Sequence, residues 1–359
     1  MKKIITVIII TAFMFSLPVA AREAAEYTIP DVGAYVLIEA VTGEILYAHN
    51  ENEQLPVSSL GKIELLLRVT EKLQAGNISL DDIVPAPDTV MRAKSPVIWL
   101  DPGETMTVED LMKSVIMASS NDAAMALAEY IGLEYTDDPH SSAYELALLT
   151  AELFSHADKD DFPLAEYYTK RLCAVRPGTE RETQLVNTNA MVQWYQGIIG
   201  GKAGHSAAAG FCTANCAERG DMKLVAVVLG AGDKDERFSL AEHLLDSGFK
   251  NFEYVTPDVD TSEFSPVKVL RGVEKLVEAA PDCSMTFIAP RGEGGRAKFE
   301  FVLPESIAAP VEAGQVLGTV TIRLGERVVA RCDIVALHAV EELTFWKSLS
   351  IITEKFFRV

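Results

Sequence analysis

Strand-like segments lie at both ends of one stretch of this chain, from about residue 27 to residue 254, and helix-like segments lie between them. At its start, residues 34–39 and 44–49 flank Thr42-Gly43, a pattern typical of a β-hairpin. Because a strand must pair with a neighbour, we expect the first and last strands to share one sheet. The stretch is therefore predicted to fold as a mixed α/β (α+β) domain. The expected later strands are 198–202, 210–215 and 223–229.

Several amphipathic helices are predicted inside this domain. Residues 59–73 repeat apolar side chains at helical spacing and are followed by Gly76, a helix-ending signal. Thr107 and Asp110 form a capping-box pattern at the start of a second helix. Two further helices are expected, at 122–130 and 238–245.

The pattern changes near Pro257. Beyond it, short strand-like segments alternate with glycine-rich turns, which predicts a small all-β domain at 262–340. The last stretch, 341–359, changes period again and places large apolar groups on one helical face: Phe345, Leu349, Ile352, Phe356 and Val359. This amphipathic helix is expected to lie on a membrane surface as an anchor, because it is too polar to span a bilayer. Packing against its own β domain is the alternative.

The first residues resemble an export signal. Lys2 and Lys3 precede an apolar run at 4–19, and Val19-Ala20-Ala21 offers small residues for cleavage. We expect residues 1–21 to be a signal peptide, which places the mature protein on the extracytoplasmic face of the membrane. A retained transmembrane anchor is the alternative, although the run is short for a span.

Composition excludes several kinds of partner. The net charge is −20 at pH 7, which disfavours nucleic acid because phosphate binding needs clustered Lys and Arg. The five cysteines include no C-x-x-C pair, and the six histidines show no ligand spacing. We therefore expect neither a zinc ribbon nor a redox dithiol, and the histidines are expected to be surface or packing residues. The sequence does not decide whether any cysteines pair.

A Ser-x-x-Lys tetrad occurs three times, and the copy at Ser59–Lys62 differs from the others by its context. It lies just after the predicted hairpin, in the first turn of an amphipathic helix. Residues three apart on a helix are neighbours, so the Lys62 amine can reach the Ser59 hydroxyl and activate it as a nucleophile. The helix N-terminus also places backbone N–H groups where an oxyanion would form. An N-capping serine with a solvated lysine is the structural alternative.

Two further motifs follow in order. Ser119-Ser-Asn121 lies between two predicted helices, and Lys202-Ala203-Gly204-His205 lies at a predicted strand. Ser-x-x-Lys, Ser-x-Asn and Lys-x-Gly in this order are the signature of penicillin-interacting serine acyltransferases. The chain resembles the serine D-Ala-D-Ala carboxypeptidases, the low-molecular-mass penicillin-binding proteins, over nearly its whole mature length. The resemblance implies a β-lactamase/transpeptidase-like catalytic domain at 27–254, a C-terminal β domain and a membrane-anchor helix.

The resemblance also implies roles for single residues. Ser59 would attack the peptide carbonyl of stem peptides ending in D-Ala-D-Ala, and β-lactams would acylate it covalently. Lys62 would be the general base, and Ser119 would relay a proton to the leaving amine. The backbone N–H groups of Ser59 and His205 would form the oxyanion hole. The resemblance implies no metal and no cofactor. Four residues would bind the substrate: Lys202, Asn121, Gly204 and His205.

Three departures from the family pattern leave alternatives open. Ala203 replaces the usual Thr or Ser, Gly61 replaces the usual Thr before Lys62, and the rim segment after Gly132 is short. A missing hydroxyl contact to a carboxylate costs about 1.5–3 kcal/mol. The main alternative is therefore a weakened enzyme that serves as a peptidoglycan-binding scaffold. A β-lactamase is the third hypothesis, disfavoured by the added β domain.

Overall fold

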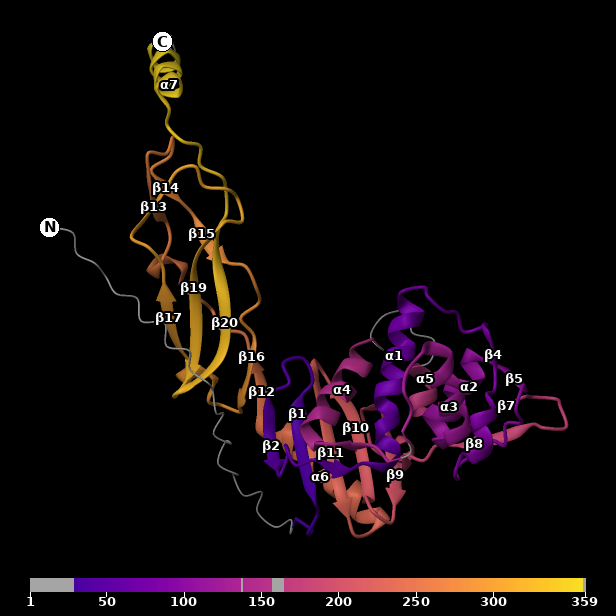
Figure 1. The fold of residues 1–359 in the computed structure, drawn as a ribbon. Helices are drawn as coiled ribbons and strands as arrows, with labels where there is room; N and C mark the ends of the chain where they lie inside the picture. Colours follow the sequence, from indigo (N-terminus) through magenta and orange to yellow (C-terminus); the bar gives the residue numbers. More distant parts are fainter. Residues whose placement is uncertain (1–28, 137, 157–164, 358–359) are drawn as a thin grey trace. The chain divides into compact units, whose positions relative to one another are not determined.

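The computed structural model describes residues 29–136, 138–156 and 165–357. It divides into two compact units, the first ending at Phe249 and the second beginning at Lys250 (Figure 1). The change of composition near Pro257 therefore lies inside the second unit. The expected signal peptide at 1–21 lies outside the described residues. Among the helices within those ranges, none has the length and apolar character needed to cross a membrane.

The first unit is built on a five-stranded antiparallel sheet with the order β2-β1-β11-β10-β9. β1 pairs with β11 along its whole length, so the first and last strands of the unit share one sheet, as predicted. The observed β9 reaches Ser206, four residues beyond the expected end, because its ladder with β10 continues to that residue. The strands are β1 (Ala34–Glu39), β2 (Ile45–His49), β9 (Ile198–Ser206), β10 (Gly210–Arg219) and β11 (Met222–Ala231).

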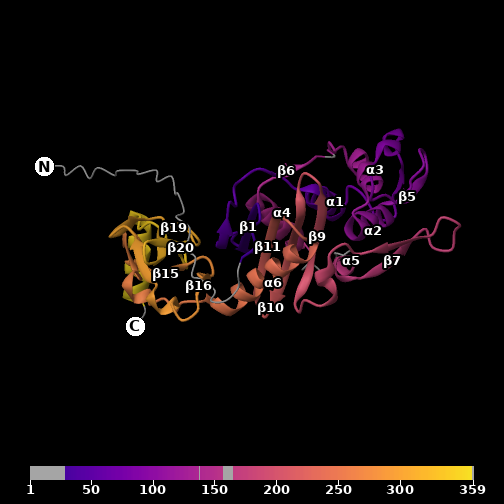
Figure 2. The same ribbon diagram turned by 90° about the horizontal axis from the view of Figure 1, so that it is seen from below.

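Helices cover both faces of this sheet (Figure 2). Val36 and Ile38 of β1 belong to the same apolar core as Ala147 of α4, whereas Leu37 points to the other face and meets Gly248 of α6. The remaining helices gather beyond the β9 edge, where they form the wall facing the strand (Figure 1). The helices are α1 (Lys62–Gln74), α2 (Val108–Ala118), α3 (Asn121–Ile131), α4 (Ala143–His156), α5 (Ala165–Thr169) and α6 (Lys234–Asn251).

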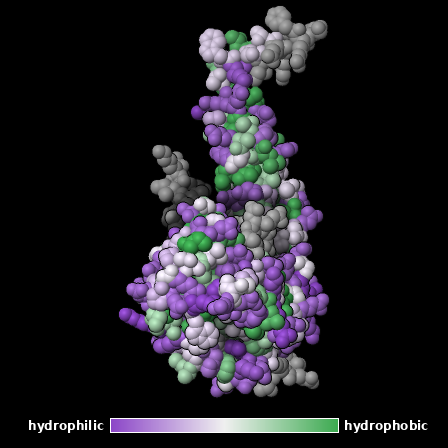
Figure 3. Space-filling view, turned by 90° about the vertical axis from the view of Figure 1, so that its right-hand side faces the viewer, coloured by the Kyte–Doolittle hydropathy of each residue, from purple (hydrophilic) through white to green (hydrophobic). Residues whose placement is uncertain are grey.

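Short elements complete the first unit. The surface over four of them, β4, β5, β7 and β8, is mostly hydrophilic with small, scattered apolar patches (Figure 3). Three two-stranded ladders join β3 to β6, β4 to β5, and β7 to β8. The strands are β3 (Leu55–Pro56), β4 (Ile83–Pro85), β5 (Thr105–Thr107), β6 (His140–Ser141), β7 (Leu172–Val175) and β8 (Thr183–Val186). The 3-10 turns are η1 (Ser58–Gly61), η2 (Asp88–Arg92) and η3 (Ala190–Gln193).

Local signals explain several helix ends. The Thr107 hydroxyl accepts a hydrogen bond from the Asp110 N–H at 3.1 Å, which caps α2 as expected. Gly132 ends α3 in the left-handed conformation that a glycine adopts without strain. The first predicted helix begins later than expected. Ser59 lies in the 3-10 turn η1, and the α-helix begins only at Lys62.

The second unit is rich in β-structure, and its apolar core includes Val269, Phe287 and Val320. A four-stranded antiparallel sheet has the order β15-β20-β19-β17, and a second sheet has the order β14-β13-β18. β12 pairs with β16. The strands are β12 (Phe252–Val255), β13 (Val267–Leu270), β14 (Leu276–Val277), β15 (Ala279–Pro281), β16 (Phe287–Pro290), β17 (Lys298–Val302), β18 (Ser306–Ala308), β19 (Val316–Leu324) and β20 (Arg327–Ala336), with 3-10 turns η4 (Thr261–Glu263) and η5 (Gly294–Arg296).

Two features of the second unit bear on open points of the sequence. Cys283 and Cys332 form a disulfide. The chain then ends in helix α7 (Phe345–Phe357), within the segment expected to be amphipathic. Three large apolar side chains near its start are exposed: Phe345, Trp346 and Leu349.

Candidate active site

A cavity of about 500 Å³ lies in the first unit, where η1 and the start of α1 meet α3, β9 and the segment that follows α3. Four of the predicted site residues line it: Ser59, Lys62, Asn121 and His205. The other three, Ser119, Lys202 and Gly204, are placed beside these by the contacts described below. The structure therefore brings together residues that are up to 146 positions apart in the sequence.

Ser59 lies directly against strand β9. A Cβ atom added to Gly204 would come within 2.8 Å of the Ser59 backbone nitrogen and 3.0 Å of the Ser59 Cβ. Only a glycine therefore permits this approach of the strand to the serine. The preceding residue, Ser58, has φ 50°, which is a strained conformation for a residue with a side chain. Such strain is characteristic of functional turns, and here it lies next to Ser59 in η1.

Ser119 and Lys202 form a buried pair. The Lys202 Nζ lies 2.6 Å from the Ser119 Oγ, and the two side chains belong to residues that are 1% and 2% exposed. Ser119 ends α2 in the left-handed conformation, with φ 56°. The Lys202 Nζ also donates hydrogen bonds to two carbonyl oxygens of α2, those of Val115 at 2.6 Å and Ile116 at 2.9 Å. The end of α2 and the strand β9 are thus joined through one lysine.

The environment of Lys202 disfavours its charged form. Burial, and then the positive charge of Lys62, lower the pKa of Lys202 well below its ordinary value. A neutral amine still satisfies all three contacts, because its two N–H groups can donate to the carbonyl oxygens while its lone pair accepts a hydrogen bond from the Ser119 hydroxyl. Lys202 and Ser119 can therefore stay hydrogen-bonded in either protonation state of the lysine.

Asn121 is held at both ends of its amide. Its Nδ2 donates to the Lys94 carbonyl at 2.7 Å, and its Oδ1 accepts from the Tyr135 hydroxyl at 3.1 Å. Its backbone N–H donates to the Pro96 carbonyl at 2.7 Å. Lys94, Ser95 and Pro96 themselves line the cavity. The loop that carries them is thus part of the site.

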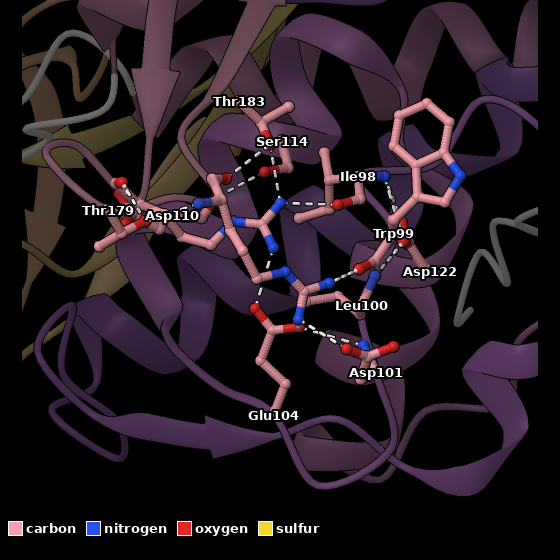
Figure 4. Close-up of polar contacts among 12 residues, drawn as sticks. Ile98, Trp99, Leu100, Asp101, Glu104, Asp110, Ser114, Asp122, Thr179 and Thr183 are labelled. Carbon is pink, nitrogen blue, oxygen red and sulfur yellow. Dashed lines mark hydrogen bonds and ion pairs between the residues drawn. The ribbon is translucent and has the colours of Figure 1, made fainter.

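The buried carboxylate of Asp122 fixes the continuation of this loop. It accepts hydrogen bonds from the backbone N–H groups of Ile98 at 3.1 Å and Leu100 at 3.0 Å (Figure 4). It also accepts one from the backbone N–H of Ala123 at 2.9 Å. Three backbone donors that burial would otherwise leave unpaired are satisfied by one side chain. Asp122 therefore links the start of α3 to the loop.

Two arginines hold the same loop from the other side. Arg176 donates to the Ile98 carbonyl at 2.6 Å and to Glu104 at 2.9 Å. Arg181 donates to the Trp99 carbonyl and, at 2.7 Å, to both Asp101 and Glu104. Figure 4 shows Trp99, Asp101 and Glu104 gathered around this network. The loop from residue 94 to residue 101 is thus anchored by Asn121 at its start and by charged groups at its end.

The structure gives a physical reason for one departure from the family pattern. A Cβ atom at Gly61 would come within 2.6 Å of the Pro139 Cβ. The short rim places Pro139 directly over the turn, where its carbonyl accepts the Val57 N–H at 2.9 Å. Gly61 and the short rim therefore belong together.

Ala203 is 2% exposed and offers no hydroxyl, and the exposed His205 ring stacks on Phe211 at 4.1 Å between centroids.

Three residues of the site escaped the sequence reasoning. The Tyr135 hydroxyl binds Asn121. The Thr188 Oγ1 lies 3.5 Å from the Ser119 Oγ, and its only sequence signal was its position between Asn187 and Asn189. Arg237 donates to the Gly204 carbonyl at 2.6 Å from α6. No local pattern marks the tyrosine or the arginine, because both act through contacts between distant segments.

Taken together, the antiparallel sheet, the adjoining helices and the Ser-x-x-Lys serine define the class of penicillin-interacting serine hydrolases. The family described as D-alanyl-D-alanine carboxypeptidase matches residues 21–138 and 131–233. The family described as penicillin-binding protein 5, C-terminal domain, matches residues 252–342. The chain belongs to the D-alanyl-D-alanine carboxypeptidase family of serine peptidases, with the C-terminal β domain of the low-molecular-mass penicillin-binding proteins.

Individual relatives agree with this assignment. The D-alanyl-D-alanine carboxypeptidase DacF of Bacillus subtilis is 30% identical over 340 residues, which cover 86% of each chain. DacC of Escherichia coli is 30% identical over 363 residues, covering 91% of this chain and 88% of that one. Penicillin-binding protein 5 from Haemophilus influenzae has a similar structure, with a TM-score of 0.73, 25% identity, and coverage of 88% of this chain and all of that one. The predicted fold class, family and enzyme class are thus confirmed.

Proposed function

We propose that this chain removes the terminal D-Ala from peptidoglycan stem peptides through an acyl-enzyme on Ser59, and that β-lactams trap the same serine. The observation that carries the assignment of residues is the meeting of three motifs at one cavity. Ser59 lies against Gly204 of β9, and Lys202 of the same strand is hydrogen-bonded to Ser119 at 2.6 Å. The family membership supplies the reaction class.

In the acylation step, the Ser59 Oγ forms a bond to the carbonyl carbon of the penultimate D-Ala as its proton passes to the Lys62 amine. The carbonyl oxygen becomes an oxyanion, which the backbone N–H groups of Ser59 and His205 bind. The bond to the terminal D-Ala nitrogen then breaks. That nitrogen takes the proton that Lys62 received from Ser59, relayed through the hydroxyl of Ser119, which Lys202 holds at the end of α2. Asn121 binds the substrate backbone and keeps the scissile bond against Ser59.

In the deacylation step, water attacks the ester carbon and gives a proton to Lys62. The bond from that carbon to the Ser59 Oγ then breaks, and the Ser59 oxygen takes the proton back from Lys62. Lys202 has a second role in substrate binding. An incoming terminal carboxylate favours the ammonium form of this buried lysine, so that binding of the substrate and protonation of Lys202 are coupled. The reaction needs no cofactor in this scheme.

The test is intact-protein mass spectrometry of the full chain after incubation with benzylpenicillin, beside Ser59→Ala. We expect a penicilloyl adduct on the wild type alone, followed by D-Ala release from a diacetylated Lys-D-Ala-D-Ala peptide. Absence of an adduct at high drug concentration would refute the enzyme assignment and favour a peptidoglycan-binding scaffold. Rapid turnover of the penicillin, without D-Ala release, would instead indicate a β-lactamase.

We also propose that the chain is exported and that α7 lies on the extracytoplasmic surface of the cytoplasmic membrane. Support comes from the exposed fractions of Phe345 and Trp346, which are 73% and 76%. Aromatic residues of this kind favour the headgroup region of a bilayer. Co-sedimentation with lipid vesicles tests the proposal, with a chain that ends at Thr344 as the comparison. Equal sedimentation of the two chains would contradict it.

A further inference from the structure

The described residues that follow α3 line the cavity, and the chain is anchored before and after them. At one end, Gly132 turns the chain in the left-handed conformation and the Leu133 N–H donates to the Ala128 carbonyl at 2.8 Å. At the other end, the Pro139 carbonyl accepts from Val57, and β6 pairs with β3. Residues 133–136 all line the cavity. The short rim of this chain is thus a built wall of the site.

Tyr135 is the residue of this wall that faces the reacting groups. Its hydroxyl donates to the Asn121 Oδ1 at 3.1 Å, and its ring centroid lies 6.0 Å from the Lys62 Nζ. It is half-buried, and Lys62 is 6% exposed. One aromatic side chain therefore contacts a proposed substrate-binding residue and adjoins the proposed general base.

The hydrogen bond from Tyr135 restricts what the Asn121 amide can do. An asparagine amide has one acceptor oxygen and two N–H groups. Here one N–H donates to the Lys94 carbonyl and the oxygen accepts from Tyr135, so a flipped amide would set its oxygen against a carbonyl. The second N–H is the group that the proposed mechanism gives to the substrate backbone. Because the first N–H and the oxygen of the amide are both held, the second N–H can point in only one direction.

We propose that Tyr135 is a positioning residue for the D-Ala-D-Ala peptidase reaction, which holds the Asn121 amide in the orientation that binds the substrate backbone. The inference rests on the proposed function of this cavity. It concerns a residue outside the three signature motifs, supplied by the short rim that distinguishes this chain from the family pattern.

The experiment is a double-mutant cycle in the full chain. Tyr135→Phe removes the hydroxyl and keeps the ring. Its effect is measured first in the wild type and then in the Asn121→Ala variant. A net hydrogen bond corresponds to a factor of about 2 to 10 in an equilibrium or rate. We therefore expect Tyr135→Phe to lower kcat/KM for the diacetylated tripeptide by about 2- to 10-fold, mainly through KM, and to lower the rate of acylation by benzylpenicillin similarly. In the Asn121→Ala background the same change should have no further effect.

A matched control is available on α3 itself. Tyr130→Phe removes a phenol hydrogen bond of similar length, 2.9 Å to Asp82, from an exposed site that does not line the cavity. It should leave both rates unchanged. An equal loss from Tyr135→Phe in both backgrounds, or no loss in either, would overturn the inference. Because the wild type is first tested for its Ser59 adduct, failure of the proposed function is seen separately from failure of this role.

Discussion

Gly204→Ala adds one methyl group where strand β9 passes the nucleophile. The new Cβ would lie 2.8 Å from the Ser59 backbone nitrogen, 3.0 Å from the Ser59 Cβ and 3.2 Å from the Ser58 Oγ. The backbone of Gly204 is outside the left-handed region, so the effect comes from this contact alone. A carbon and a backbone nitrogen do not pack at 2.8 Å, so one of the two segments must move.

The strand has little freedom to retreat. Gly204 is paired with Cys212 of β10, and its carbonyl accepts a hydrogen bond of 2.6 Å from the buried Arg237. The displacement therefore falls on Ser59 and its N–H, which is the proposed oxyanion donor. Loss of one such donor lowers the rate about 100- to 1000-fold. Overpacking itself costs about 1–3 kcal/mol, or a fall in Tm of about 2–12 °C at 2–4 °C per kcal/mol.

Stopped-flow acylation by a chromogenic cephalosporin measures the first effect, and calorimetry measures the second. Gly232→Ala is the matched control, because its added Cβ meets only the Glu236 Oε2 at 3.6 Å, an ordinary contact. We expect the control to acylate and melt like the wild type. A Gly204→Ala protein that is folded and acylates at the wild-type rate would refute the assignment of the Ser59 N–H to the oxyanion hole.

Three other predictions concern the charged and polar groups of the site. Because the pKa of Lys202 is lowered, its ammonium is lost at a lower pH than that of an ordinary lysine, so KM for the carboxylate tripeptide should rise as the pH rises through that pKa. The C-terminally amidated tripeptide should show no such rise. Parallel pH profiles of KM for the two peptides would contradict the role of Lys202. Ala203→Thr restores a hydroxyl for the substrate carboxylate and should raise kcat/KM about tenfold or more for the carboxylate peptide only; an equal gain for the amidated peptide would argue against this contact. Asp122→Ala leaves three backbone N–H groups without their carboxylate and should destabilise the fold by about 3 kcal/mol or more, which a lower Tm would show. A Tm equal to that of the wild type would mean that the loop does not depend on this side chain.

Local signals predicted those parts of the fold that local physics decides. The β1–β2 hairpin follows from alternating strands around Thr42-Gly43, and the start of α2 follows from the Thr107 cap. The end of β9 was predicted too early, because Gly204 weakens a strand in isolation. In the folded chain the ladder to β10 carries the strand through Gly204 to Ser206. Tertiary pairing thus overrides the local preference at the residue that contacts Ser59.

The remaining parts of the site depend on contacts that no short pattern encodes. Arg237 reaches Gly204 across 33 positions, and Thr188 reaches Ser119 across 69. The three signature motifs could be predicted because each has its own spacing, whereas these supporting residues are single side chains of common types. Their roles follow only from the packing of α6 and the β8–β9 connection against the strand.

The departures from the family pattern illustrate how such contacts change the meaning of a residue. In the sequence, Gly61 counts as a weakened helix start, at a cost of about 1 kcal/mol relative to Ala. In the structure, any side chain at that position would collide with Pro139 at 2.6 Å, so the glycine is what allows the short rim to close over the turn. The same closure places Tyr135 against Asn121. Gly61 and the short rim are therefore better explained as one coordinated change than as two independent losses, which favours a working active site over a decayed one.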